Sequence, residues 1–261
     1  MGLLIFFSLL FIIVMLHEGG HLVVAKMNKV QVNVFSIGFG WRIIGIKFYL
    51  GRSGCFHFSC RLFNFKPYNP DIWNLEKLTE YRIAPIFLGG FCAMGGETKS
   101  TGSKSDLVSK SYSQKVCVAL AGVGVNVLTG FMTIYAVIAS KIGIVEGFSK
   151  TLKYVGFMFS TLGTSIVDLF SGNVQIVTAS ETAKIMTGLS FETYLLMFGV
   201  FSITLGLFNL IPFPALDGSL PLLWLAEKFH KNGQIIVHRV ILVGFIILMI
   251  LQLIILFFWL R

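Results

Sequence analysis

The residues best suited to chemistry are His17, Glu18 and His21, which form a His-Glu-x-x-His sequence inside the first apolar stretch of the chain. If this stretch is a helix, residues four apart lie on one face, one turn apart, so both imidazoles can reach the same metal ion. Glu18 directly follows His17, and its carboxylate can reach a water molecule beside that ion. Two histidine ligands with a neighbouring carboxylate as general base are the arrangement of zinc hydrolases.

The apolar setting of this motif favours a metal over a chance match. From Leu3 to Leu16 every residue except Ser8 is apolar, and apolar residues continue from Leu22 to Ala25. Ionisable side chains at the centre of a membrane-spanning helix cost about 3 kcal/mol each unless something compensates them. A bound Zn²⁺ would do so, and the alternative is a polar seam between packed helices. We therefore predict that His17 and His21 bind zinc and that Glu18 is catalytic.

The composition predicts an integral membrane protein. Of the 261 residues, 55% are hydrophobic and 13% are charged, whereas soluble domains carry about 25% charged residues. The net charge of +9 comes from Lys and Arg spread through loops, without the aromatic-interleaved basic patch of a nucleic-acid binder. The four cysteines are too few for a disulfide framework in a chain of this length.

Four stretches approach or exceed the roughly 20 residues that a membrane-spanning helix needs. They are residues 3–25, 116–139, 194–211 and 235–260. The first lacks the basic segment that begins a signal peptide, so we interpret it as a mature span. A fifth apolar stretch, residues 154–167, is shorter and bounded by charges, which indicates an amphipathic helix between the second and third spans.

The distribution of Lys and Arg predicts the orientation in the membrane. Residues 27–114, between the first two spans, carry 11 of them, whereas residues 141–192 carry four. Because cytoplasmic loops are richer in Lys and Arg, we expect both termini outside and the active site towards the cytoplasmic side.

Two stretches after the first span have a β-like pattern. Residues 30–46 alternate apolar and polar side chains around Gly38, and residues 80–94 contain Gly89 and Gly90. We expect a β-hairpin region, about residues 30–97, that re-enters the membrane next to the metal helix, since irregular backbone at membrane depth must face protein or a wet cavity. Its exposed edge could take up an unwound substrate as an added strand. The alternative is an ordinary cytoplasmic hairpin, and residues 51–79 between the two stretches indicate no clear function.

The metal would need a third protein ligand, and Asp217 is the best candidate. It is the only acidic residue between Glu192 and Glu227, and it follows a predicted helix that Pro212 and Pro214 end. A proline-interrupted helix at membrane depth makes an irregular, hydrated pocket. A helix-capping role is the alternative for Asp217.

With these elements in place, the chain resembles the site-2 proteases, a family of intramembrane zinc metalloproteases. The resemblance covers nearly the whole chain. It is carried by His17–His21, by Phe35–Gly40 with Pro85–Gly90, by Ala121–Asn126, and by Asn209–Gly218, which matches the family's N-x-x-P-x-P-x-L-D-G element.

The resemblance implies a function and a set of site residues. Zinc would be bound by His17, His21 and Asp217, with Glu18 catalytic, and Asn209 would help to hold the substrate together with Gly38, Gly89 and Gly90 of the hairpin. Single-span membrane proteins of a bacterial inner membrane, such as anti-sigma factors or remnant signal peptides, would be the substrates. Relatives carry PDZ domains between the second and third core helices, but residues 141–192 are too few for one, so we expect a single protease domain without PDZ.

Two other functions use the same residues without hydrolysis. A metal-ion transporter or sensor would need further ligands across the membrane, and His238 is the only other histidine or acidic residue in the remaining spans. A catalytically inactive scaffold is disfavoured because no residue of the zinc set is missing.

Overall fold

The structure is a computed structural model that describes residues 2–50, 56–64, 79–97, 101–171, 179–227, 229 and 233–259. Within these residues four helices are long and apolar enough to cross a membrane. They are α1 (Gly2–Met27), α3 (Tyr112–Ile142), α6 (Phe191–Asn209) and α8 (Gly233–Trp259). The prediction of an α-helical membrane protein with about four spans is therefore confirmed.

The chain forms two compact units. The sheet unit comprises residues 14–122, and the helical unit comprises residues 1–13 and 123–261. The boundaries fall inside α1 and α3, so both helices contribute a part to each unit. The prediction of a single protease domain stays a prediction.

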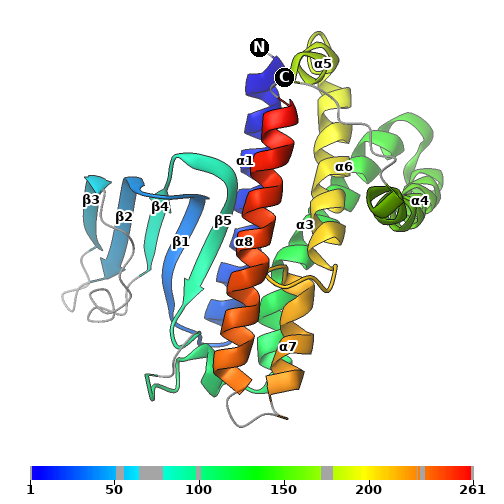
Figure 1. Ribbon diagram of the computed structural model, residues 1–261. Coiled ribbons are helices and arrows are strands. Elements are labelled where there is room, and N and C mark those ends of the chain that lie inside the picture. Colours follow the sequence, from blue (N-terminus) through cyan, green and yellow to red (C-terminus); the bar gives the residue numbers. More distant parts are fainter. Residues whose placement is uncertain are drawn as a thin grey trace. The chain divides into compact units, whose positions relative to one another are not determined.

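A five-stranded sheet dominates the sheet unit, in the order β3-β2-β4-β1-β5 (Figure 1). The strands are β1 (Val32–Phe39), β2 (Arg42–Leu50), β3 (Phe56–Asn64), β4 (Glu80–Ile83) and β5 (Ile86–Met94). β1 pairs parallel with β4 and antiparallel with β5, and β2 pairs antiparallel with β3 and β4.

This sheet is larger than the predicted hairpin region. Each predicted stretch is divided into two strands, because Gly40 turns the chain with a φ of 103° after β1 and Pro85, which has no N–H group, interrupts the second stretch. β3 lies in the segment for which the sequence indicated no function.

Backbone hydrogen bonds tie the end of the sheet to the start of β1. Gly95 N–H donates to the Gln31 carbonyl over 2.7 Å, and Gln31 N–H donates to the Ser105 carbonyl over 2.9 Å. The Asp106 carboxylate accepts hydrogen bonds from the backbone N–H and the hydroxyl of Thr101. These contacts fix the position from which α3 begins.

Small residues bring α3 and α6 close together in the helical unit. A Cβ on Gly130 would lie 2.6 Å from the Gly199 carbonyl, and one on Gly206 would lie 3.2 Å from Asn126 Cβ. The Ser202 hydroxyl donates to the Asn126 carbonyl over 2.9 Å. Close backbone approach through small residues, with added polar contacts, is how helices associate where no water drives burial.

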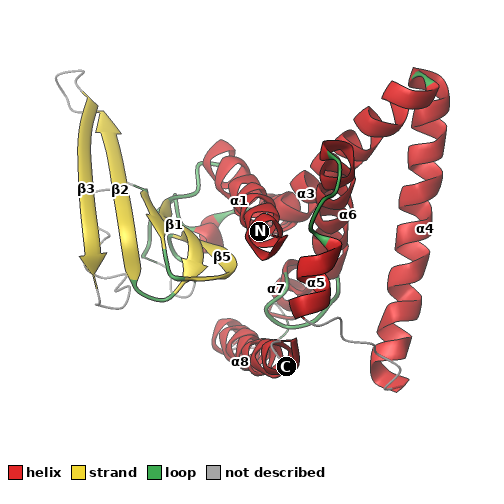
Figure 2. Cartoon of the chain, turned by 90° about the horizontal axis from the view of Figure 1, so that it is seen from above, coloured by secondary structure: helices red, strands yellow, loops and turns green. Residues whose placement is uncertain are grey.

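The amphipathic segment is longer than predicted. It forms α4 (Ile144–Ser171), which follows α3 after Gly143, whose φ is 91° (Figure 2). Val155 of α4 joins Ile203 and Leu207 of α6 in the buried core, while Phe157 and Phe159 stay exposed. α5 (Ala179–Ile185) and α7 (Leu220–Glu227) are short helices of the same unit.

Candidate metal centre

The two predicted histidine ligands converge on one point in the sheet unit. His17 and His21 are buried one turn apart on α1, and their Nε2 atoms are 3.3 Å apart. In a tetrahedral site with zinc–nitrogen bonds of about 2.0–2.1 Å, two nitrogen ligands are about 3.3–3.4 Å apart. The pair therefore fits a shared zinc ion.

A backbone carbonyl of α3 fixes which nitrogen of His21 is available. His21 Nδ1 lies 2.8 Å from the Val118 carbonyl oxygen. Because that oxygen can only accept, Nδ1 carries the proton and Nε2 keeps its lone pair for a metal. This contact cannot be predicted from the sequence, since any residue type supplies the same carbonyl.

Gly122 makes room for both imidazoles. A Cβ at this position would overlap His21 Nε2 and would lie 2.8 Å from His17 Nε2. Such distances are far below van der Waals contact, so a side chain here would displace the rings. The resemblance to the family includes the small-residue stretch 121–126, but the sequence does not indicate that Gly122 contacts the histidines.

Glu18 lies against β5 of the sheet. It is 9% exposed, and a Cβ on Gly90 would lie 2.8 Å from Glu18 Cγ and 2.7 Å from the Ser36 carbonyl. Gly90 therefore lets β5 pass directly beside the carboxylate. Among the described strands β5 pairs only with β1, so its other side is a sheet edge.

The other two predicted hairpin glycines have structural reasons of their own. Gly38 has a φ of 88°, a backbone conformation that favours glycine, and a Cβ on Gly89 would lie 2.7 Å from the Phe39 ring. Both glycines shape the strands next to Glu18, and their contact with substrate stays a prediction.

Cys92 on β5 is the other potential nucleophile near Glu18. Desolvation, followed by the negative charges of Glu18 and Glu97, raises the pKa of the Cys92 thiol well above its ordinary value. A protonated thiol is a poor nucleophile. The raised pKa of Cys92 therefore disfavours cysteine chemistry beside Glu18.

Asp217 and Asn209 belong to the helical unit. Asn209 is the last residue of α6, and its side-chain amide donates to the Leu205 carbonyl over 3.0 Å. Asp217 begins a 3₁₀ turn, Asp217–Ser219, after the proline-containing loop. Its role as third ligand stays a proposal.

The loop that carries Asp217 is held tightly on both sides. A Cβ on Gly218 would overlap the Leu210 carbonyl at the end of α6, and one on Gly244 of α8 would overlap the Pro214 carbonyl. Ala215 has a φ of 80°, a strained conformation for a residue with a side chain. Strain of this kind persists only where the surroundings fix the backbone, which suits a carboxylate that must be presented in one position.

The chain has a buried histidine pair with an adjacent carboxylate, on a helix that can cross a membrane. These features are those of membrane proteins with a zinc-hydrolase site. Comparison with known sequences narrows this class. The chain belongs to peptidase family M50, whose sequence profile matches residues 5–59 and 67–251.

Curated relatives have names of the same kind. The chain is 31% identical over 130 residues to a candidate zinc metalloprotease of Borreliella burgdorferi. This alignment covers 46% of the chain and 24% of that protein. The chain is also 26% identical over 142 residues to zinc metalloprotease Rip1 of Mycobacterium tuberculosis. This alignment covers 52% of the chain and 28% of Rip1. The chain thus matches less than a third of the length of these relatives.

Proposed function

We propose that the chain is an intramembrane zinc metalloprotease that hydrolyses peptide bonds within or near transmembrane segments of membrane proteins. The observation that carries this proposal is the His17–His21 pair, whose Nε2 atoms are 3.3 Å apart, with the tautomer of His21 set by the Val118 carbonyl. Membership of a peptidase family supports the same chemistry.

Zinc needs a third protein ligand in a catalytic site, so that one position remains for water. We assign this ligand to Asp217, because its carboxylate stands at a rigid proline-containing loop and matches the family element from Asn209 to Gly218. A bound zinc ion would lower the pKa of water to about 7 and polarise the carbonyl group of the scissile bond.

We assign the proton transfers of this reaction to Glu18. As general base its carboxylate accepts the proton of the attacking water, and as general acid it returns the proton to the leaving amine. Burial of Glu18 between α1 and β5 keeps bulk water away from this exchange.

The edge of β5 is the proposed binding site for an unwound substrate. A transmembrane helix hides its carbonyl groups in its own hydrogen bonds, and breaking these leaves polar groups that cost about 1–3 kcal/mol each when buried and unsatisfied. A strand edge can pair with the freed backbone. The passage of β5 past Glu18 at Gly90 would then place the substrate backbone beside the catalytic carboxylate, and Asn209 would help to hold it.

The substrates and the membrane are also part of the proposal. Single-span proteins of a bacterial inner membrane are the expected substrates, and the charge distribution puts the metal site towards the cytoplasm with both termini outside. A metal-ion transporter or sensor is the competing function that the experiment below excludes or supports.

The test replaces Glu18 by glutamine, which keeps the shape of the side chain but cannot accept the proton. Glu18→Gln should bind zinc like wild type and lose cleavage of a single-span membrane substrate by at least about 10²-fold, the lower end of general base catalysis. Glu146→Gln, an exposed change in α4, is the control and should keep full activity.

The zinc content of the purified variants distinguishes a residue that binds the metal from one that acts only as a base. Asp217→Ala should lose zinc, whereas Glu18→Gln should not. Equal cleavage by wild type and Glu18→Gln would show that the chain is not a protease of this mechanism, and unchanged metal transport in Glu18→Gln would favour the transporter.

A further inference from the structure

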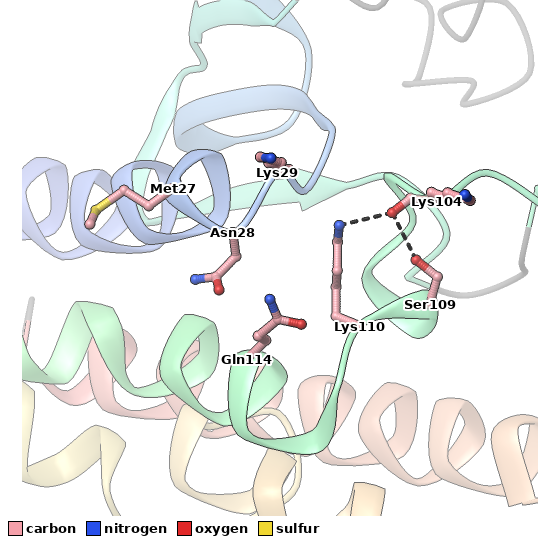
Figure 3. A pocket seen from close by; sticks show the side chains of 7 residues that line it. All are labelled: Met27, Asn28, Lys29, Lys104, Ser109, Lys110 and Gln114. Carbon is pink, nitrogen blue, oxygen red and sulfur yellow. Dashed lines mark hydrogen bonds between the residues drawn. The ribbon is translucent and has the colours of Figure 1, made fainter.

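A basic pocket lies where α1 ends and α3 begins, within the sheet unit (Figure 3). Its volume is about 440 Å³, and its lining residues come from the end of α1, the turn before α3 and the first turn of α3. They are Met27, Asn28, Lys29, Lys104, Ser109, Lys110 and Gln114. Three of these seven residues are lysines and none is acidic, so the pocket attracts anions.

The backbone at Lys29 adopts a conformation that glycine would adopt more easily. Val30 N–H donates to the Ala25 carbonyl and Lys29 N–H donates to the Lys26 carbonyl, which is the hydrogen-bond pattern of a Schellman cap. The residue at the left-handed position of this cap is usually glycine, but here it is Lys29, with a φ of 56°. Lys29 thus lines the pocket from a backbone conformation that costs local free energy.

Further hydrogen-bond donors face the same pocket. The Lys110 ammonium donates to the Lys104 carbonyl over 2.8 Å, which holds it in place while leaving two of its protons available. The Gln114 side-chain oxygen accepts the Ser111 N–H, so its amide nitrogen is the end turned towards Asn28 in Figure 3. Within the described part of the chain, ion pairs occupy Lys141 and Lys150 but none of the three pocket lysines.

The position of the pocket decides which anion it meets. Met27 ends one membrane-spanning helix and Tyr112 begins the next, so the pocket lies where these two spans leave the hydrocarbon layer. The phosphate groups of lipids occupy this level of a membrane, and basic pockets between spans bind anionic headgroups. An exposed Met27 at the rim would contact acyl chains.

We propose that this pocket binds the headgroup of an anionic phospholipid, with Lys29 and Lys110 beside the phosphate, Lys104 at the rim and the Gln114 amide as a further donor. The lipid would fasten the end of α1 to the start of α3. Because these two segments also carry His21 and Val118, the bound headgroup stabilises the helix pair that presents the metal ligands.

The proposal is tested by lipid binding, without any catalytic readout. The purified protein in neutral detergent micelles is titrated with phosphatidylglycerol while its Tm is measured. Wild type should gain stability in a saturable manner, and Lys29→Gly, Lys104→Gln and Lys110→Gln should each weaken the apparent affinity about fivefold. Lys29→Gly should not lower the Tm without lipid, because glycine suits the left-handed position.

Controls distinguish a lipid site from general charge attraction. Lys153→Gln, the same charge change on exposed α4, should keep the affinity within twofold, and phosphatidylcholine should give no saturable rise of Tm. The proposal is wrong if the pocket variants respond to phosphatidylglycerol like wild type. It is also wrong if inorganic phosphate or polyglutamate protects wild type as well as the lipid does, since the pocket would then take a soluble phosphate or an acidic peptide.

Discussion

The missing side chain of Gly122 decides whether two imidazoles can share a metal ion. An added methyl group would overlap His21 Nε2 and would lie 2.8 Å from His17 Nε2. Gly122→Ala should therefore weaken zinc binding at least about tenfold, the lower end of the cost seen when residues that support metal ligands are changed. Zinc content after dialysis against a graded series of chelator concentrations measures the effect.

Gly124 provides a matched control two residues further along α3. A Cβ there would meet no atom within 4 Å, so Gly124→Ala should keep wild-type zinc affinity. If both variants bind zinc equally well, the histidine rings do not depend on the space at Gly122, and the proposed geometry of the centre is wrong.

The metal-binding side chains of this centre can be predicted from the sequence, but the groups that hold them in place cannot. The spacing of His17, Glu18 and His21 predicts a shared face of a helix, because helical geometry alone determines it. The Val118 carbonyl cannot be predicted in this way, since every residue has one and only the tertiary structure selects which carbonyl meets His21. The role of Gly122 cannot be predicted either, because a glycine in an apolar helix equally indicates close packing against another helix.

At the scale of elements, the contact between α3 and α6 depends on glycines that face each other. A Cβ on Gly130 would lie 2.6 Å from both the Gly199 carbonyl and Ile203 Cγ1, so the two helices would have to separate. Gly130→Ala should lower the Tm by several degrees, since overpacking a close contact costs about 1–3 kcal/mol.

The comparison for this change is Gly156→Ala on α4. A Cβ at Gly156 would meet nothing within 4 Å, and alanine has the higher helix propensity, so the Tm should stay equal or rise slightly. Circular dichroism melts in detergent measure both variants. An unchanged Tm for Gly130→Ala would mean that the close contact between α3 and α6 does not stabilise the fold.

The spans and the sheet differ in how far the sequence predicts them. Each span is a local property of some 20 apolar residues, and α6 ends at Asn209 because Pro212 and Pro214 cannot continue it. The sheet requires pairing between distant segments, such as Val34 of β1 with Glu80 of β4. Alternation indicates strands but carries no information about which strands become neighbours, so the five-stranded order could not be predicted.

At the scale of the whole molecule, the orientation in the membrane determines on which side of the membrane the metal site is open to water. α3 is long and apolar enough to cross the membrane once between Ser103 and Ser149, so we expect these two exposed serines on opposite sides. The segment before α3 is rich in Lys and Arg, which predicts that Ser103 is cytoplasmic.

Labelling of single cysteines in a variant without the four native ones tests this orientation in intact cells. Cysteine in place of Ser149 should react with a membrane-impermeant thiol reagent, whereas cysteine in place of Ser103 should react only after the membrane is permeabilised. Reaction at Ser103 alone would reverse the orientation, and the metal site would then open away from the cytoplasm. Reaction of both positions in intact cells would mean that α3 does not cross the membrane, because a single crossing must separate them.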